Sequence, residues 1–195
     1  MLRAPATGAG LRWYDLGMSR SRCAGGLFLA PLWLLAVPAV ANSGAKVTCE
    51  ITENGQPASG TISISADGAE VVEGTCGRPL AIPAGTHEAV LRLDGALDGP
   101  ERRLPLEAIA GRSIPVSADF ATGLLEVRIQ SQGRDTAGIA VIRKAGRQVG
   151  TLGSGVTAHL SVGSYEVIAR YRSHEQRFDA VEIRKGERKA LAASF

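Results

Sequence analysis

Apolar and polar residues alternate along most of the chain after residue 46, with the two-residue period of strands that bury one face. The alternation is clearest in 125–129 and in 164–172, where aliphatic residues and tyrosines alternate with glutamates and arginines. Turn-forming pairs such as Gln132-Gly133 and Val162-Gly163 separate such stretches at intervals of roughly 8–12 residues. No stretch has a convincing helical period, so the pattern predicts an all-β protein.

Seven short strands are expected in each half of the folded region. In the first half they span 47–51, 61–65, 70–72, 80–82, 86–93, 103–109 and 114–120. In the second half they span 125–129, 138–143, 148–149, 156–161, 164–172, 177–183 and 188–195. Short strands separated by regular turns are typical of a β-sandwich. The sequence therefore predicts two tandem seven-stranded β-sandwich domains.

The second half of the chain also repeats the first at an offset of 78 residues, so that 47–93 align with 125–171 without a gap. After a contraction of three residues the two ends align as well, 118–120 with 193–195. A repeat of this length has the size of a small complete domain. We therefore expect one domain at 42–120 and a second at 121–195. Five glycine pairs coincide in the alignment: Gly55/Gly133, Gly60/Gly138, Gly68/Gly146, Gly77/Gly155 and Gly85/Gly163.

The first 41 residues have the organisation of a secretory signal peptide. Arg20 and Arg22 precede an apolar run at 27–37, and Ala39-Val40-Ala41 forms a small-x-small cleavage site. Met18 is the better start, so 1–17 are interpreted as an over-extended gene start. The alternative is a membrane anchor, but the apolar run is shorter than the ~20 residues that a spanning helix needs. We expect cleavage, no membrane span afterwards, and a periplasmic or secreted protein.

Removal of residues 1–41 changes the charge of the protein. The whole chain has 22 basic and 19 acidic residues, and cleavage leaves 18 of each. A neutral mature chain gives no general case for nucleic-acid binding. The charge is nevertheless uneven, because 42–120 carry six basic and eleven acidic residues, whereas 121–195 carry twelve and seven.

The basic excess of the second domain suggests a partner-binding face for an anionic envelope protein or glycan. A solvated strand face, or attraction between the two domains, would explain the same pattern. Most of the excess comes from seven residues: Arg170, Arg172, Arg177, Arg184, Lys185, Arg188 and Lys189.

Two cysteines remain after cleavage, Cys49 and Cys76. An exported compartment favours a disulfide between them, with two buried free thiols as the alternative. Their counterparts in the second repeat are Val127 and Ser154, so only the first domain can have the bridge. In the chain-entropy description the cross-link would stabilise the domain by roughly 3–4 kcal/mol.

No catalytic constellation, cofactor motif or metal-ligand cluster stands out in the sequence, so we expect no enzyme activity, no cofactor and no metal. The three histidines, His87, His159 and His174, are scattered without partners at ligand spacing. An acidic loop contains Asp94 and Asp98 and lies in the segment that the second repeat contracts. With Glu101 it could hold calcium, although its spacing matches no calcium loop and a plain turn is the simpler interpretation.

The stretch 160–167, Leu-Ser-Val-Gly-Ser-Tyr-Glu-Val, resembles the turn and strand of carboxypeptidase-regulatory-like and PEGA domains, and 82–87 is its counterpart. The flanking stretches 118–127 and 181–187 are similar to the same tandem modules of bacterial envelope proteins. The resemblance covers nearly all of 46–195. It implies an Ig-like or prealbumin-like sandwich with a non-catalytic accessory role. In the second repeat Val162 stands where the motif usually has proline. In the first repeat His87 stands where the motif usually has tyrosine.

These observations lead us to expect a non-catalytic exported protein that binds or scaffolds partners in the bacterial cell envelope. A carbohydrate-binding module is one alternative, and an accessory or structural domain of a hydrolase without its own ligand is another. Sugar binding usually needs exposed aromatic rings, and the aromatic residues of the mature chain fall mostly on expected core positions. These residues are Phe120, Tyr165, Tyr171, Phe178 and Phe195.

Overall fold

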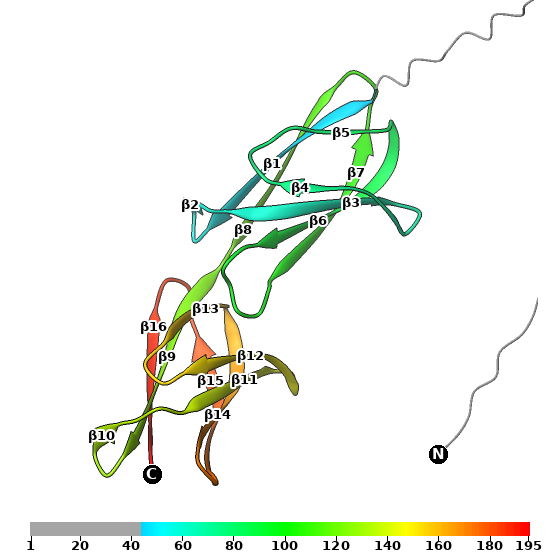
Figure 1. Cartoon of the computed structure of the whole chain (residues 1–195). Coiled ribbons are helices and arrows are strands. Elements are labelled where there is room, and N and C mark those ends of the chain that lie inside the picture. Colours follow the sequence, from blue (N-terminus) through cyan, green and yellow to red (C-terminus); the bar gives the residue numbers. More distant parts are fainter. Residues whose placement is uncertain (1–43) are drawn as a thin grey trace, which may run out of the picture. The chain divides into compact units, whose positions relative to one another are not determined.

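The computed structural model describes residues 44–195, and the expected signal peptide lies outside the described residues (Figure 1). This part of the chain consists of strands and turns without a helix, so the predicted all-β class is confirmed. Among the described residues, no helix has the length and apolar character needed to cross a membrane.

Each repeat contains eight strands in 44–195, one more than the seven expected. The additional elements are the two-residue strands β2 and β10, which close tight hairpins onto β1 and β9. In the first repeat the strands are β1 (Ala45–Glu53), β2 (Gln56–Pro57), β3 (Gly60–Ala66), β4 (Ala69–Thr75), β5 (Leu80–Ile82), β6 (Gly85–Leu93), β7 (Glu101–Ala108) and β8 (Ser113–Phe120). In the second they are β9 (Thr122–Ser131), β10 (Arg134–Asp135), β11 (Ile139–Lys144), β12 (Arg147–Gly153), β13 (Thr157–Ser161), β14 (Gly163–Tyr171), β15 (His174–Ile183) and β16 (Arg188–Ser194).

Both repeats have the same sheet topology. One sheet of the first repeat is antiparallel with the order β4-β3-β6-β7, and the equivalent sheet of the second is β12-β11-β14-β15. In the other sheet, β1 pairs with β2, β5 and β8, and β9 pairs in the same way with β10, β13 and β16. The β1–β8 and β9–β16 pairs are parallel. Because the last strand returns beside the first, each repeat closes around its own interior.

Alternating burial explains why these segments pair as they do. In β1 the side chains of Ala45, Val47, Cys49 and Ile51 are buried, whereas the residues between them are exposed. The inward faces form one apolar core in the first repeat and a second core in the other. The segment between β6 and β7 contributes to both, because Ala96 packs against the first core and Leu97 against the second.

The connection between the repeats is a single residue, Ala121, between the end of β8 and the start of β9. Thr122 is only 1% exposed. Its N–H donates to Asn54 Oδ1 at 3.0 Å, and Asn54 Nδ2 donates to the Thr122 carbonyl at 3.1 Å. The Asn54 amide therefore satisfies the backbone of Thr122 as a neighbouring strand would, and this holds the connection against the β1–β2 turn.

Cys49 and Cys76 form the disulfide that the sequence predicted, with their Cα atoms 4.7 Å apart. The bond joins β1 of one sheet to the segment that follows β4 of the other sheet. In the second repeat Ser154 occupies the position of Cys76, and its Oγ accepts a hydrogen bond from the Ile129 N–H at 2.9 Å. A hydrogen bond therefore takes the place of the covalent link there.

We expect the double substitution Cys49→Ser and Cys76→Ser to lower the free energy of unfolding by about 3.5 kcal/mol, because the bond closes a chain segment of 27 residues. Urea unfolding with and without dithiothreitol measures the effect. The reductant should lower the midpoint of the native protein and leave that of the double variant unchanged. Equal midpoints for the native protein and the variant under oxidising conditions would contradict this prediction.

Candidate functional site

The most elaborate polar site of the described chain lies where the β6–β7 loop of the first repeat meets the second repeat. Ala96 forms a parallel bridge with His159 of β13, and the Leu97 N–H donates to the His159 carbonyl at 2.8 Å. The Leu97 side chain lies over Gly150, where a Cβ would be only 2.5 Å from Leu97 Cδ1. Glycine at position 150 therefore makes room for a side chain that belongs to the other repeat.

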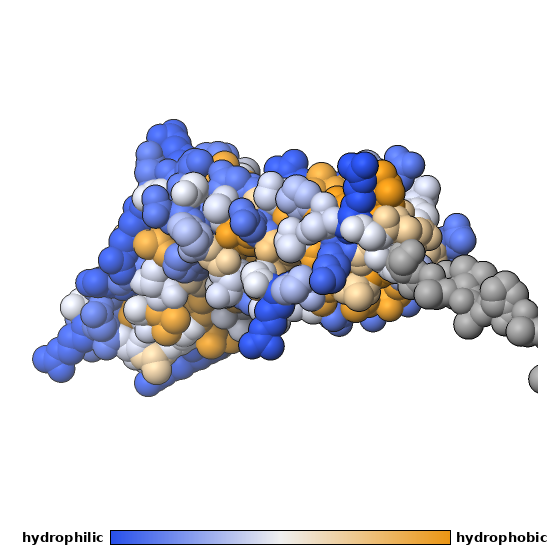
Figure 2. Space-filling model, turned by 90° about the horizontal axis from the view of Figure 1, so that it is seen from above, coloured by the Kyte–Doolittle hydropathy of each residue, from blue (hydrophilic) through white to orange (hydrophobic). Residues whose placement is uncertain are grey.

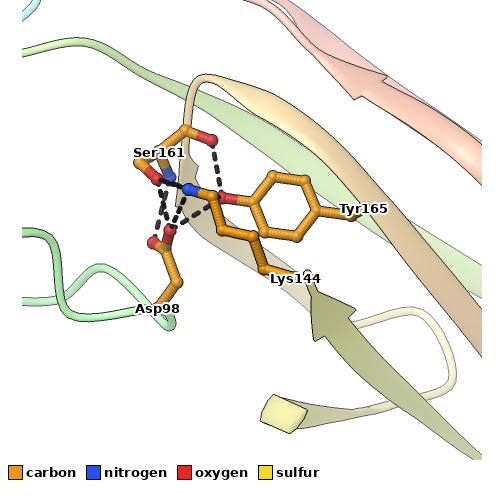
Figure 3. Close-up of polar contacts among 4 residues, drawn as sticks. All are labelled: Asp98, Lys144, Ser161 and Tyr165. Atoms are coloured by element: carbon orange, nitrogen blue, oxygen red, sulfur yellow. Dashed lines mark hydrogen bonds and ion pairs between the residues drawn. The ribbon is translucent and has the colours of Figure 1, made fainter. Parts of the chain in front are cut away.

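Asp98 follows Leu97, and its carboxylate is enclosed by donors from three strands of the second repeat (Figure 3). Its side chain is 3% exposed. Oδ1 accepts the Ser161 N–H at 3.0 Å. Oδ2 accepts from Lys144 Nζ at 3.1 Å, lies 2.7 Å from the Tyr165 hydroxyl, and also accepts the Ser161 hydroxyl. We call Asp98, Lys144, Ser161 and Tyr165 the Asp98 cluster.

Regular strand positions place the other members of the Asp98 cluster. Lys144 ends β11, Ser161 ends β13, and Tyr165 lies in β14 with its ring in the second core, 2% exposed. The Tyr165 hydroxyl also lies 2.7 Å from the Ser161 carbonyl, so a buried ring carries its polar end to the rim of the sandwich. Lys144 Nζ lies 4.9 Å from the centre of this ring, within cation–π distance.

Electrostatics keep Asp98 and Lys144 in their charged forms. Burial alone would raise the pKa of Asp98, but the hydrogen bonds from Ser161, Tyr165 and Lys144 together outweigh it and lower the pKa below 3.8. Burial opposes the charge of Lys144 too, yet its bonds to Tyr165 and Asp98 raise its pKa above 10.5. The pKa of Tyr165 is raised, mainly by burial, which leaves the phenol neutral.

Serine, lysine, tyrosine and aspartate are also residue types of catalytic sites, where an activated serine needs a neutral base beside it. In the Asp98 cluster the Ser161 hydroxyl donates to a carboxylate, and Lys144 is an ammonium that has no lone pair to accept a proton. The cluster therefore serves to fasten the loop of one repeat onto the other.

A second polar contact lies beside the connection between the repeats. Glu53, at the end of β1, accepts the Thr122 hydroxyl and lies 2.7 Å from His159 Nδ1. Burial raises the pKa of Glu53, but the hydrogen bonds from Thr122 and His159 exceed that effect and the net pKa is lowered. His159 thus contacts the β6–β7 loop through its carbonyl and the β1 end through its ring, so one residue joins both contacts.

The seven basic residues singled out in the sequence are divided between several elements. Arg170 and Arg177 lie on β14 and β15 and form ion pairs with Glu175 (2.8 Å) and Glu166 (2.9 Å). Their strands belong to one sheet of the second repeat, whereas Arg188 and Lys189 lie on β16 of the other sheet.

Two of the remaining basic residues also form ion pairs with acidic neighbours. Arg188 pairs with Glu126 at 2.8 Å, and Lys185 lies 3.6 Å from Asp119 of the first repeat. Within residues 44–195, three of the seven basic residues form no ion pair. These are Arg172, in the β14–β15 turn, Arg184, in the β15–β16 loop, and Lys189.

The acidic loop considered for calcium has its carboxylates turned apart. Asp98 Oδ2 is used by side chains of the second repeat, and Glu101 binds Arg92 at 2.6 Å. The described residues contain no group of three or more histidine, cysteine or acidic side chains placed to hold a metal ion. His87 is buried, and its Nε2 lies 3.0 Å from the Pro83 carbonyl.

Equivalent grooves open beside β1 and β9 in the two repeats. The larger has a volume of about 620 Å³ and the smaller about 370 Å³. Cys49, Cys76 and Gly77 line the smaller groove, and Ser154 and Gly155, the counterparts of the last two, line the larger. Neither lining includes an aromatic ring, and the aromatic residues of 44–195 pack in or against the two cores.

Sequence reasoning did not bring Lys144, Ser161 and Tyr165 together, although the sequence contains a signal for them. The loop with Asp98 lies in the segment that is three residues longer in the first repeat. The first repeat has Ala66, Pro83 and His87 at the three aligned positions. The first repeat thus has the longer loop with the carboxylate, and the second repeat has the donors that bind it, which is the arrangement that a contact between repeats requires.

No family profile matches this chain. No curated protein sequence matches it either. Similar solved structures include the Bacillus anthracis TIE protein, with a TM-score of 0.34 and 12% identity. The match covers 78% of this chain and 34% of that chain, so this chain spans about a third of the length of the TIE protein. A candidate adhesin from Bacteroides ovatus has a TM-score of 0.39 and 7% identity over 78% and 92% of the two chains. A minor pilin of Streptococcus agalactiae has a TM-score of 0.34 and 11% identity, over 77% of this chain and 94% of that chain. Values this low carry no argument about function.

We expect Asp98→Asn to lower the free energy of unfolding by about 2–4 kcal/mol, because the amide keeps the shape but removes the charge that Lys144 and two hydroxyls bind. Chemical unfolding measures the loss. Asp94→Asn is the matched control in the same loop, with an exposed side chain, and should change stability by no more than about 0.5 kcal/mol. Equal effects of the two substitutions would argue against the fastening role.

The lowered pKa of Asp98 also predicts a dependence on pH. A carboxylate whose folded pKa lies below its unfolded value stabilises the fold at higher pH and loses that contribution as pH falls through the folded pKa. The difference in unfolding free energy between the native protein and Asp98→Asn should therefore be constant near neutral pH. It should begin to shrink below about pH 5 and fall further through the folded pKa, which lies below 3.8. Unfolding curves over an acid pH series test this, and a difference that already vanishes well above that value would contradict it.

Proposed function

We propose that this chain is a non-catalytic exported protein of the bacterial cell envelope, in which two β-sandwiches fastened to each other bind or scaffold an envelope partner. The observation that carries the proposal is the Asp98 cluster. The cluster joins the repeats through a buried carboxylate, and the Leu97 side chain, which packs against the second core, reinforces the join. Fixed neighbouring domains present their loops and strand faces in a constant arrangement, which lowers the entropy cost of binding a partner.

Export is supported by two independent features. The expected signal peptide at 1–41 would direct the chain out of the cytoplasm. The Cys49–Cys76 disulfide persists in an oxidising compartment. The resemblance to carboxypeptidase-regulatory-like and PEGA modules points the same way, toward tandem accessory domains. The periplasm or the cell surface is the proposed location.

The partner is proposed to be anionic, with a protein favoured over a glycan. Arg172, Arg184 and Lys189 lack an ion pair within residues 44–195 and are exposed, so their charges are available to a partner. Arg170 and Arg177 have carboxylate partners already and would contribute less. The buried or packed aromatic residues make the carbohydrate-binding alternative weaker. An accessory domain without its own ligand remains the second candidate, favoured by the interspersed polar and apolar surface in Figure 2.

The experiment is a capture from the envelope fraction with the exported protein, expressed from its full sequence, as bait. A second bait carries Arg172→Glu and Arg184→Glu, and a control bait carries Arg170→Glu and Arg177→Glu. We expect a partner retained by the native bait and the control, and lost or weakened at least tenfold with the first variant. Retention of the partner by all three baits would refute the proposed contact residues. No retained partner would support the accessory domain without a ligand.

A further inference from the structure

The outer strands of the four sheets differ in how well they are protected against pairing with another chain. An outer strand presents free N–H and C=O groups that can bind a further strand. Within 44–195, β7 contains Pro105 and β8 contains Pro115, and proline supplies no donor for such pairing. In β15 the pairing with β14 is interrupted at a bulge that includes Ala180, which has a φ of 52°. β12 is weakened by Gly150 and Gly153.

Two outer strands of seven residues have neither proline nor a bulge through most of their length. β16 pairs with β9 without a register shift from Arg188 to Ser194. β4 has a shift near Val71 and contains one glycine, Gly74, but it pairs regularly with β3 from Val72 to Thr75. Val71 itself is 38% exposed. Both strands therefore offer a regular free edge.

The backbone of β16 shows which way its free groups point. The Phe195 N–H donates to the Gln130 carbonyl of β9 at 2.9 Å, whereas the Ser194 N–H points away from β9 and donates to Gln176 Oε1 at 3.0 Å. Because N–H groups alternate in direction along a strand, the N–H of Ala192 points the same way as that of Ser194. In the described part of the chain β16 has no second strand partner, so this side is free apart from the Gln176 contact at Ser194 (Figure 1). Ala190 and Ala192 are small and exposed, which lets another strand approach closely.

The two free edges have opposite charges. Glu70 and Glu73 of β4 are exposed and form no ion pair within residues 44–195, and Lys189 of β16 is likewise exposed and unpaired there. The repeats that contain them have opposite excess charge, with five more acidic residues in 42–120 and five more basic residues in 121–195. Opposite charges across a strand pair stabilise it, whereas β4 paired with β4 would oppose glutamates.

We propose that the free edge of β16 pairs with the free edge of β4 in a second copy of this chain, so that copies associate head to tail. The contact uses a different surface on each partner, so each copy keeps one free β4 or β16 edge and the association can continue beyond two copies. This assembly goes beyond the proposed function. Its β16 edge shares Lys189 with the residues assigned to the envelope contact, whereas Glu70 and Glu73 of β4 lie outside them.

Sedimentation velocity of the exported protein, over a concentration series up to about 1 mM, tests the proposal. We expect an average mass that rises with concentration and falls with added salt, because the paired charges are exposed. Glu70→Lys with Glu73→Lys should weaken association by about tenfold or more, and Lys189→Glu should weaken it too. A mixture of these two variants should associate again, because each then offers an edge of opposite charge to the other.

Ala192→Pro removes an outward N–H without touching the ladder to β9, and Ala192→Ser is its matched control. We expect the proline variant to lose association and the serine variant to keep it. Each variant is first compared with the native protein by its unfolding midpoint. If the proline variant is unfolded, the variants of Glu70, Glu73 and Lys189 test the proposal instead.

A protein that stays monomeric throughout would overturn the proposal. So would association that survives both sets of charge changes, or a mixture that fails to associate. The Glu70→Lys, Glu73→Lys bait in the envelope capture separates the two proposals, since it should still retain the envelope partner.

Discussion

The burial of one carboxylate, that of Asp98, is the constraint on which the contact between the two sandwiches depends. A carboxylate removed from water is costly unless every lone pair finds a donor. The second repeat provides these donors from the ends of β11 and β13 and from near the start of β14. Next to Asp98, Leu97 packs against the second core and Ala96 pairs with β13. A short loop of the first repeat thereby covers part of the core of the second.

The two repeats share a framework and differ where each has to meet its surroundings. The same strand order and the same grooves occur in both. The first repeat adds a disulfide between β1 and the segment after β4, where the second has only the hydrogen bond of Ser154. In the second repeat a tyrosine hydroxyl reaches the rim at the position where the first has the ring of His87. The two repeats therefore differ mainly in the Cys49–Cys76 disulfide and in the residues of the second repeat that bind Asp98.

The outer strands of the sheets also differ in whether they can pair with another chain. Prolines and a bulge blunt three of the outer strands, and such devices keep sheets from pairing with other chains. β16 has neither device and β4 has only one register shift, and these two seven-residue strands carry opposite charge. Stable contact within one copy and selective contact between copies would then use different parts of the same β-sandwich framework.

Much of this protein was determined by local sequence. The period of two in apolar residues, the turn glycines and the internal repeat predicted an all-β chain with two similar halves. The disulfide of Cys49 and Cys76 was predicted from the expected signal peptide and from the two cysteines that its cleavage would leave, because an exported compartment favours disulfides. The two-residue strands β2 and β10 were missed, since a tight hairpin of this size leaves no alternating pattern to detect.

Only the tertiary structure determined which residues bind Asp98 and which basic residues form ion pairs. Periodicity reports which face of a strand is buried, but it does not report which distant residues meet at a strand end. Lys144, Ser161 and Tyr165 lie 46 to 67 residues from Asp98 in the chain and converge because three strand ends lie at one rim of the second sandwich. In the same way, net charge predicted a basic domain, whereas the pairing of Arg170, Arg177 and Arg188 with nearby glutamates depends on cross-strand register.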